Sequence, residues 1–302
     1  MQEGKQMNRE KRRIQSAFDG LTLEMEMMIP EKVKGIVQIS HGMAEHKERY
    51  EQFMEYLAGY GYMSVIHDHR GHGKSVNDTR ELGFFYTEDT QAMVEDLHQI
   101  TVGIKKEYPD KPVYLFSHSM GTLVARNYIK KYDADISKLI MCGPPTKNPF
   151  VGLGIVLAKS SQKRKGKMHR NEFLHSLAFK ESVRHWLTTD QREVELYQQD
   201  PLCGYIFTNN GFLHLFTLMK DAYSKDGWKG NNPQLPIFLI AGSDDPVIQS
   251  PKKFRALSSF LQSRGYENIE SKIYSGKKHE LLNEVGREEV YRDVLAFLEK
   301  TF

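Results

Sequence analysis

Six short segments with the composition of strands, most of them apolar nearly throughout, recur along the chain, separated by longer segments with helical periodicity. These segments are GIVQIS (35–40), YMSVIHD (62–68), PVYLFSH (112–118), KLIMCG (138–143), PIFLIAG (236–242) and IESKIYS (269–275). Strands that read as continuous apolar runs are typical of parallel sheets, because helices bury both faces of such sheets. The alternation therefore predicts an α/β protein with a mostly parallel central sheet flanked by helices.

The segments between these strands support the same architecture. Near the N-terminus, the runs 14–18 and 21–28 flank Asp19-Gly20, a pair typical of the tight turn in a β-hairpin. Apolar residues three and four positions apart indicate helices. On this basis helices are predicted over 90–108, 119–131 and 287–300.

The alternation of strands and helices is interrupted between residues 147 and 232. This segment has no clear central strand, and residues 172–179 and 212–223 have helical periodicity. So long a segment between two core strands cannot be a simple loop. The sequence therefore predicts a core formed by residues 1–146 and 233–302, with a helical lid inserted over 147–232. Pro144-Pro145 and Asn231-Asn232-Pro233 mark the expected hinges.

Charge and cysteine content exclude several classes of protein. The 302 residues carry a net charge of +3, which is too close to neutral to indicate a nucleic-acid partner. Two cysteines, Cys142 and Cys203, form no disulfide framework and fit a reducing compartment. The first twenty residues lack an apolar signal core, and the apolar run 151–158 is too short to cross a bilayer. We expect a soluble, cytoplasmic protein.

One basic cluster is found in the expected lid. Residues 159–170, KSSQKRKGKMHR, contain no acidic residue. We expect a solvated, mobile loop here. The alternative is a loop that contacts anionic lipid or substrate headgroups.

The segment Ser117-His118-Ser119-Met120-Gly121 is the strongest candidate for a nucleophile. Ser119 lies where a predicted strand gives way to a predicted helix, which is the context of the G-x-S-x-G nucleophile elbow. The residues flanking such a turn must be small: Gly121 meets this fully, and Ser117 replaces the usual first glycine. We expect the Ser117 hydroxyl to point away from the site. The alternative role for Ser119 is a helix N-cap.

A serine nucleophile needs a histidine base, and the base needs an orienting carboxylate. In proteins with this elbow, the order along the chain is serine, acid, histidine. His279 is the only histidine that follows the acidic residues after the strand 236–242, so we expect it to be the base. The earlier histidines do not fit this order.

Two adjacent aspartates compete for the role of the acid. Asp244 and Asp245 follow a strand end and Gly242, at the edge of the sheet where sites form. Pro246 forces the residue before it out of helical conformation, which fixes Asp245 more firmly. We therefore favour Asp245 and expect Asp244 to form an Asx-turn or a helix cap.

Two backbone N–H groups are candidates for an oxyanion hole. Met120 follows the nucleophile directly, and Met43 follows Gly42 in the loop after the strand 35–40. One such donor typically contributes about 3–4 kcal/mol of transition-state stabilisation.

The segment HDHRGHGKS (67–75) resembles a metal site at first sight. Its histidine spacing matches no established metal-binding pattern such as H-E-x-x-H. We expect Asp68, Arg70 and His72 to hold this glycine-rich loop by hydrogen bonds near the elbow. No metal and no cofactor is predicted.

Five motifs together resemble the monoacylglycerol lipase and lysophospholipase branch of the α/β-hydrolase fold, which is also grouped with serine aminopeptidases. They are HGMAEHKERY, DHRGHGKS, SHSMG, GSDDPV and KKHELLNE. The resemblance implies Ser119, Asp245 and His279 as the catalytic triad and the amides of Met43 and Met120 as the oxyanion hole. It further implies that the end of the pocket that takes the alcohol headgroup is lined or braced by His118, Glu45 and Arg49.

The resemblance leads us to expect a serine hydrolase that cleaves lipid-like esters, monoacylglycerols or lysophospholipids, through an acyl-enzyme. Phenylalanines and leucines of the lid would form an acyl channel, and the lid would contact membrane surfaces transiently. The alternatives are a peptidase or amidase, a general carboxylesterase, or a non-catalytic binding protein on the same scaffold. The sequence gives no indication of the oligomeric state.

Overall fold

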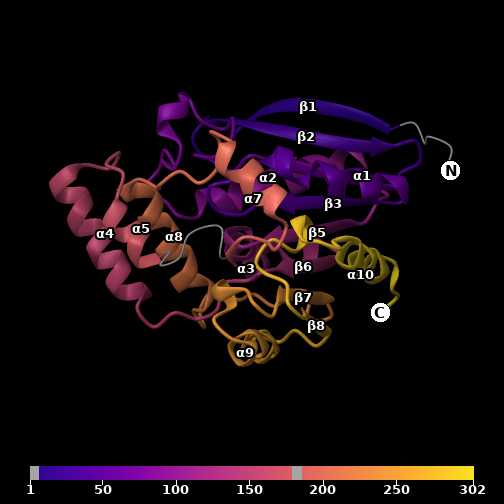
Figure 1. The fold of residues 1–302 in the computed structure, drawn as a ribbon. Coiled ribbons are helices and arrows are strands. Elements are labelled where there is room, and N and C mark those ends of the chain that lie inside the picture. The colour runs from indigo at the N-terminus through magenta and orange to yellow at the C-terminus, as the bar shows by residue number, and fades with distance from the viewer. Residues whose placement is uncertain (1–6, 179–185) are drawn as a thin grey trace.

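The computed structural model describes residues 7–178 and 186–302. Within these residues, one eight-stranded sheet has the strand order β1-β2-β4-β3-β5-β6-β7-β8 (Figure 1). The strands from β4 to β8 along this order are parallel, and β1 and β2 are antiparallel to their neighbours. The strands are β1 (Met7–Gln15), β2 (Thr22–Pro30), β3 (Gly35–Ser40), β4 (Tyr62–His67), β5 (Val113–His118), β6 (Lys138–Cys142), β7 (Ile237–Gly242) and β8 (Ile269–Tyr274).

The mostly parallel sheet predicted from the six apolar segments is confirmed. Each predicted strand is present, and its bounds agree with the structure to within one residue. Strands β3 to β7 are buried along their whole length, which explains why their sequences show no alternation.

Strand β1 is longer than the predicted hairpin. It begins at Met7, whereas the sequence indicated a strand only from Ile14. Most of the added residues are charged, and some form ion pairs with strand β2, such as Arg13 Nε to Glu24 Oε1 at 2.6 Å. Charged side chains are a common feature of edge strands, where they prevent pairing with other chains. The strand has no apolar periodicity because almost none of it is buried.

Helices cover both faces of the sheet. Alternate residues of β3 show the division, since Ile36 packs with α2 and α3 on one face, and Val37 packs with α1 and α10 on the other. Helix α9 covers the same face as α2 and α3. These helices are α1 (Glu51–Gly59), α2 (Ala92–Glu107), α3 (Met120–Tyr132), α9 (Pro251–Gln262) and α10 (Glu288–Glu299). Short 3₁₀ helices span Lys47–Tyr50, Thr79–Glu81, Asp133–Asp135, Pro246–Ile248 and Leu281–Asn283.

The inserted segment between β6 and β7 is largely helical. Figure 1 shows α4, α5 and α8 gathered beside one end of the sheet, where α8 lies next to α3. Residue 179 of the predicted helix 172–179 lies outside the described residues. No helix in the described ranges is long and apolar enough to cross a membrane. The helices of this segment are α4 (Val151–Lys165), α5 (Glu172–Ala178), α7 (Gln191–Gln199) and α8 (Asn209–Ala222).

The expectation of a mobile basic loop over 159–170 was wrong for its first seven residues. Residues 159–165 form the last two turns of α4, which ends at Gly166 with a positive φ of 86°. Lysine, arginine and glutamine are good helix formers, and basic side chains are favoured at a helix C-terminus by the helix dipole. The positive charges are therefore displayed from a helix.

Candidate active site

Ser119 lies at a sharp turn between β5 and α3. Its backbone has φ 50° and ψ −118°, a strained conformation for a residue other than glycine. The turn is held by the bond from Ser119 N to Cys142 O at 2.9 Å. The Ser119 side chain forms no capping bond to α3 among the described residues, and it lines the pocket instead. Ser119 occupies the N-cap position of α3 without capping it through its side chain, and the sharp strand-to-helix turn is the geometry of a nucleophile elbow.

The residues flanking Ser119 show why the imperfect motif is tolerated. A β-carbon on Gly121 would lie 2.1 Å from the carbonyl oxygen of Ser40, so glycine is required there. Ser117 is fully buried in β5, and its hydroxyl donates a hydrogen bond to Ile140 O at 3.0 Å. The hydroxyl of Ser117 is therefore directed into the sheet, as expected, and takes no part in the pocket.

Asp245 and His279 lie in contact although 34 positions separate them. Oδ2 of Asp245 is 2.9 Å from Nδ1 of His279, and both side chains are buried. The other carboxylate oxygen, Oδ1, accepts the N–H of Val247 at 2.8 Å, which caps the 3₁₀ helix that starts at Pro246. The carboxylate is thus fixed on one side and faces the imidazole on the other.

Asp244 does not have the role expected from its sequence position. It is exposed, and its Oδ1 accepts a hydrogen bond from Ser243 Oγ at 2.7 Å. The cap predicted for Asp244 is made by Asp245, and Ser250 caps α9. The reason is that Pro246 begins the 3₁₀ helix, which places Asp245 at its N-cap.

His279 is positioned by segments that the sequence analysis did not connect with it. A β-carbon on Gly143 would lie 3.0 Å from the His279 ring, and the φ of 57° at this position also favours glycine, so a larger residue would crowd the imidazole. The ring of Trp186 has its centroid 5.3 Å from that of His279. The backbone N–H of His279 also donates to the backbone carbonyl of Trp186 at 3.2 Å. The position of Trp186 along the chain gave no indication of this contact.

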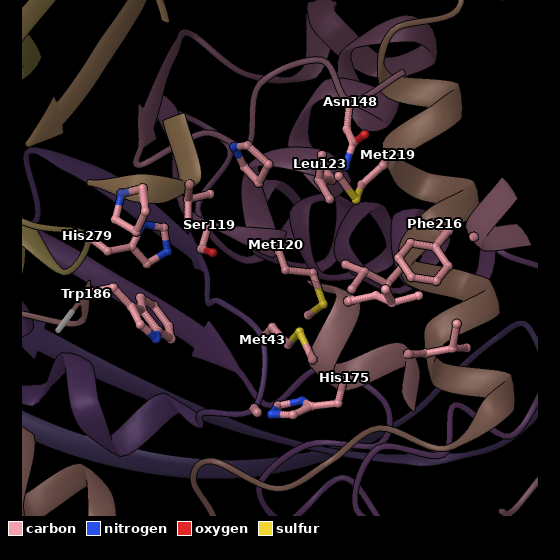
Figure 2. Close-up of a pocket in the computed structure, with 18 of the residues that line it drawn as sticks. Met43, Ser119, Met120, Leu123, Asn148, His175, Trp186, Phe216, Met219 and His279 are labelled. Atoms are coloured by element: carbon pink, nitrogen blue, oxygen red, sulfur yellow. The ribbon is translucent and has the colours of Figure 1, made fainter. Parts of the chain in front are cut away.

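The two predicted oxyanion donors belong to backbone segments close to Ser119. A β-carbon on Gly42 would lie 3.2 Å from Cβ of Ser119, so the loop that carries Met43 passes directly beside the serine. Met120 begins α3, and the first N–H groups of a helix have no carbonyl partner within it. Both methionines line the pocket (Figure 2). The arrangement suits a pair of backbone donors, and their role stays a prediction.

Glu45 connects the Met43 loop to the elbow. Its Oε1 accepts the N–H of Gly42 at 2.5 Å and the hydroxyl of Tyr50 at 2.9 Å, and it lies 3.1 Å from Nδ1 of His118. Burial opposes ionisation of both groups, but their mutual hydrogen bond and charge outweigh it. The pKa of Glu45 is therefore lowered and that of His118 raised. Both line the pocket as a buried ion pair.

Arg49 is placed behind the pocket wall and does not line it. Its guanidinium makes a bidentate pair with Glu280, at 3.0 and 2.6 Å, and lies 4.7 Å from the centroid of the Tyr197 ring. Glu280 and Tyr197 do line the pocket. Arg49 therefore braces two lining residues, neither of which was predicted from the sequence.

The pocket itself has a polar end and a long apolar end. Its volume is about 660 Å³. Ser119 and His279 point into one end, and Phe216 and Met219 of α8 line the other (Figure 2). The core contributes the polar groups, and the apolar wall comes largely from the inserted segment, including Phe150, Leu153, Leu157, Leu174, Leu215 and Phe216.

The histidine-rich loop 67–75 is a buried hydrogen-bonded structure. Asp68 accepts bonds from the backbone N–H groups of Lys47 and Lys74, at 2.8 and 2.9 Å. Nε of Arg70 donates to Oδ2 of Asp96 at 2.8 Å. Nδ1 of His72 lies 3.0 Å from the carbonyl oxygen of Arg70. Across the described ranges, no three metal-ligand side chains converge within this loop. The predicted hydrogen-bonding roles of Asp68, Arg70 and His72 agree with these contacts.

Lowering the pH below 6.5 is expected to destabilise the fold through this loop. Burial lowers the pKa of His67 and of His72 to about 3, against about 6.5 in an unfolded chain. Between these values the unfolded chain binds more protons than the folded one, so stability falls as the pH falls. The loss is about 2 kcal/mol for each of the two histidines at pH 5. Guanidinium chloride unfolding at pH 7 and pH 5 measures it.

The variant His67→Phe isolates one part of this effect. Neither ring nitrogen of His67 has a hydrogen-bond partner among the residues described, so the substitution removes no bond. The variant should lose about 2 kcal/mol less than the wild type between pH 7 and pH 5. An identical pH dependence in the two proteins would contradict the assignment.

The chain is similar to known lipases and esterases in sequence and in structure. The family model described as "Serine aminopeptidase, S33" matches residues 31–286. A monoglyceride lipase homolog of monkeypox virus is 30% identical over 275 residues, covering 88% of each chain. A monoacylglycerol lipase of Mycolicibacterium smegmatis is 25% identical, again over 88% of each chain. A thermostable carboxyl esterase from Bacillus coagulans, solved with glycerol, superposes with a TM-score of 0.87 at 26% identity, covering 97% of this chain and 98% of the esterase.

The match of the family model covers well over half of the chain and includes all five motifs noted in the sequence. The structural likeness extends over nearly the whole chain. The chain therefore belongs to the serine aminopeptidase family of α/β-hydrolases, in the branch that resembles monoacylglycerol lipases.

Proposed function

We propose that the chain hydrolyses carboxylic esters of lipid-like substrates, monoacylglycerols or lysophospholipids, through an acyl-enzyme on Ser119. The observation that carries the proposal is the position of the strained Ser119 turn. It lies at the polar end of an apolar pocket of about 660 Å³, which the buried His279 also lines. The relatives named as monoacylglycerol and monoglyceride lipases support an ester hydrolase of the lipase and esterase type.

The proposed mechanism follows from the arrangement of these groups. His279 accepts the proton of Ser119 as the serine oxygen attacks the ester carbonyl, and Asp245 holds the imidazole through Nδ1. The amides of Met43 and Met120 stabilise the oxyanion. His279 then protonates the leaving alcohol, and a water molecule activated by His279 releases the fatty acid. The chain's own groups supply each step.

The polar end of the pocket is the proposed site of the alcohol headgroup. Glu45 and His118 line this end, and Arg49 braces Glu280 beside them. Hydroxyl groups can both donate to a carboxylate and accept from an imidazolium, so a polyol headgroup suits this ion pair. The glycerol bound to the Bacillus coagulans esterase is consistent with such a preference. The opposite, apolar end would hold the acyl chain.

The inserted segment is the proposed lid, and its outer surface suits transient contact with lipid. Phe150, Leu153 and Leu177 are 72%, 57% and 51% exposed, and all three also line the pocket. The basic turns of α4 lie on the same helix as Leu153. An apolar patch flanked by basic residues binds anionic membranes.

Reversing Lys163, Arg164 and Lys165 to glutamate should lower hydrolysis on anionic vesicles but not in detergent micelles.

A peptidase on the same triad is the second candidate, favoured by the name of the family. An aminopeptidase must hold a substrate ammonium group with carboxylates. The carboxylates that line the described pocket are Glu45 and Glu280, and each is already paired, with His118 and Arg49 respectively. This pairing favours a neutral polyol over a cation at the polar end.

A substrate panel tests the proposed function. The purified chain is given a medium-chain monoacylglycerol, the lysophosphatidylcholine of equal chain length and an amino-acid anilide, and product release is measured. We expect fatty acid from the lipid esters at a kcat/KM at least about 100-fold above that for the anilide. A higher kcat/KM for the anilide would identify a peptidase. Absence of any product, together with no labelling by a fluorophosphonate, would identify a non-catalytic protein.

A further inference from the structure

Three side chains with metal-ligating atoms converge outside the proposed catalytic groups. His46, Asp200 and Cys203 each present one ligand atom, and all three atoms lie within 4.8 Å of one another. This is the only such group in residues 7–178 and 186–302. His46 comes from the core loop that also carries Met43, and the other two follow α7 in the inserted segment.

The local structure holds these side chains in place. Nε2 of His46 lies 2.8 Å from Oδ2 of Asp200, while Oδ1 of Asp200 accepts the N–H of Leu202 at 2.8 Å. The N–H of Cys203 donates to the carbonyl of Asp200 at 3.0 Å. His46 is buried, whereas the Asp200 side chain is 30% exposed, so an ion can enter from solvent on that side.

The distances are close to those of a coordinated ion. Zinc bonds of about 2.0–2.3 Å to nitrogen, oxygen and sulfur place tetrahedral ligands roughly 3.5 Å apart. The longest separation among the three atoms therefore needs to shorten by about 1 Å, and the His46–Asp200 pair needs to widen by less than about 1 Å. Imidazole, carboxylate and thiolate together favour a borderline transition metal over Ca²⁺ or Mg²⁺, which prefer oxygen ligands only. The exposed side leaves room for water as a fourth ligand.

The surrounding charges permit a cation. Arg49 lies near Cys203, but its charge is neutralised by the bidentate pair with Glu280. A metal ion binds cysteine as the thiolate, so binding must release the proton of the Cys203 thiol to solvent. Metal affinity should therefore increase with pH.

We propose that His46, Asp200 and Cys203 bind a Zn²⁺ ion that fastens the inserted segment to the core loop beside the active site. Besides the contact of His46 with Asp200, two hydrogen bonds already join these parts: Gly204 N and Tyr197 OH both donate to Ala44 O, at 2.9 and 3.1 Å. The ion would add a coordinate link at the neighbouring His46. The proposal is independent of the substrate and of the catalytic roles proposed above.

Cobalt substitution tests the site through its spectrum. The full chain, stripped with a chelator, is titrated with Co²⁺ at pH 8. We expect one equivalent to give a thiolate-to-cobalt charge-transfer band, and one equivalent of Zn²⁺ to remove it. Cys203→Ser should lose the band and bind Co²⁺ at least about 100-fold more weakly. Cys142→Ser is the matched control. Cys142 is fully buried in β6, so the variant that lacks its thiol should keep the band.

A stability measurement guards against loss of the fold. Zn²⁺ should raise the Tm of the wild type and of Cys142→Ser, and leave the Tm of Cys203→Ser and His46→Gln unchanged. The Tm of each metal-free variant shows whether it has folded. Absence of the band in the folded wild type would overturn the proposal, as would its retention in Cys203→Ser or an equal rise in Tm in all four proteins.

Discussion

Replacing Ser119 by alanine is expected to lower kcat for ester hydrolysis by about 10⁶-fold. The substitution removes the oxygen that attacks the ester, whereas the pair of Asp245 and His279 stays in place. Alanine is small enough for the turn, although its backbone must still adopt the φ of 50° found at Ser119. The remaining activity would come from the oxyanion donors and from binding. Fatty acid release under saturating monoacylglycerol measures the effect.

Ser117 provides the matched control for this experiment. Its hydroxyl donates to Ile140 O inside the sheet, so Ser117→Gly restores the usual elbow pattern without removing a pocket group. We expect kcat to stay within about threefold of the wild type, with a loss of roughly 1 kcal/mol of stability from the lost hydrogen bond. A fluorophosphonate should label the wild type and Ser117→Gly but not Ser119→Ala. Labelling of Ser119→Ala would mean that another residue is the nucleophile.

The sheet was predictable because strands that are buried on both faces have mostly apolar sequences. Residues 35–40 and 113–118 are mostly apolar for this reason. The first half of β1 has no apolar pattern, because this exposed edge strand is stabilised by pairing with β2 and by ion pairs. The basic turns of α4 were missed because a run of positive charge is compatible with either a helix or a loop.

The candidate site was predictable where turn chemistry and chain order constrain it. Ser119 follows from the elbow pattern and His279 from the order of the three groups along the chain, whereas Asp245 follows from that order together with Pro246. Gly143 and Trp186 could not be inferred in this way, because their contacts with His279 arise only when distant backbone segments meet. No local sequence pattern indicates which distant backbone segments will come into contact.

The different roles of the two adjacent aspartates give the second large prediction. Asp245→Asn should lower kcat by about 10⁴-fold, because the amide can donate to Nδ1 of His279 and so hold the imidazole in the wrong tautomer. The bond to Val247 N can be kept by the amide oxygen, so the turn itself should be preserved. The loss of activity would then be electrostatic in origin.

Asp244→Asn controls for charge and position in the same loop. Asp244 is exposed and accepts a hydrogen bond only from Ser243 among the described residues, a contact that asparagine can keep. We expect its kcat to stay within about twofold of the wild type. The kcat values and the Tm of both variants should be measured with the same monoacylglycerol. A normal Tm with a large loss in Asp245→Asn alone would establish that carboxylate as the orienting group. A comparable loss in Asp244→Asn would instead mean that the charge of the loop matters and that the contact of Asp245 with His279 is not the decisive feature.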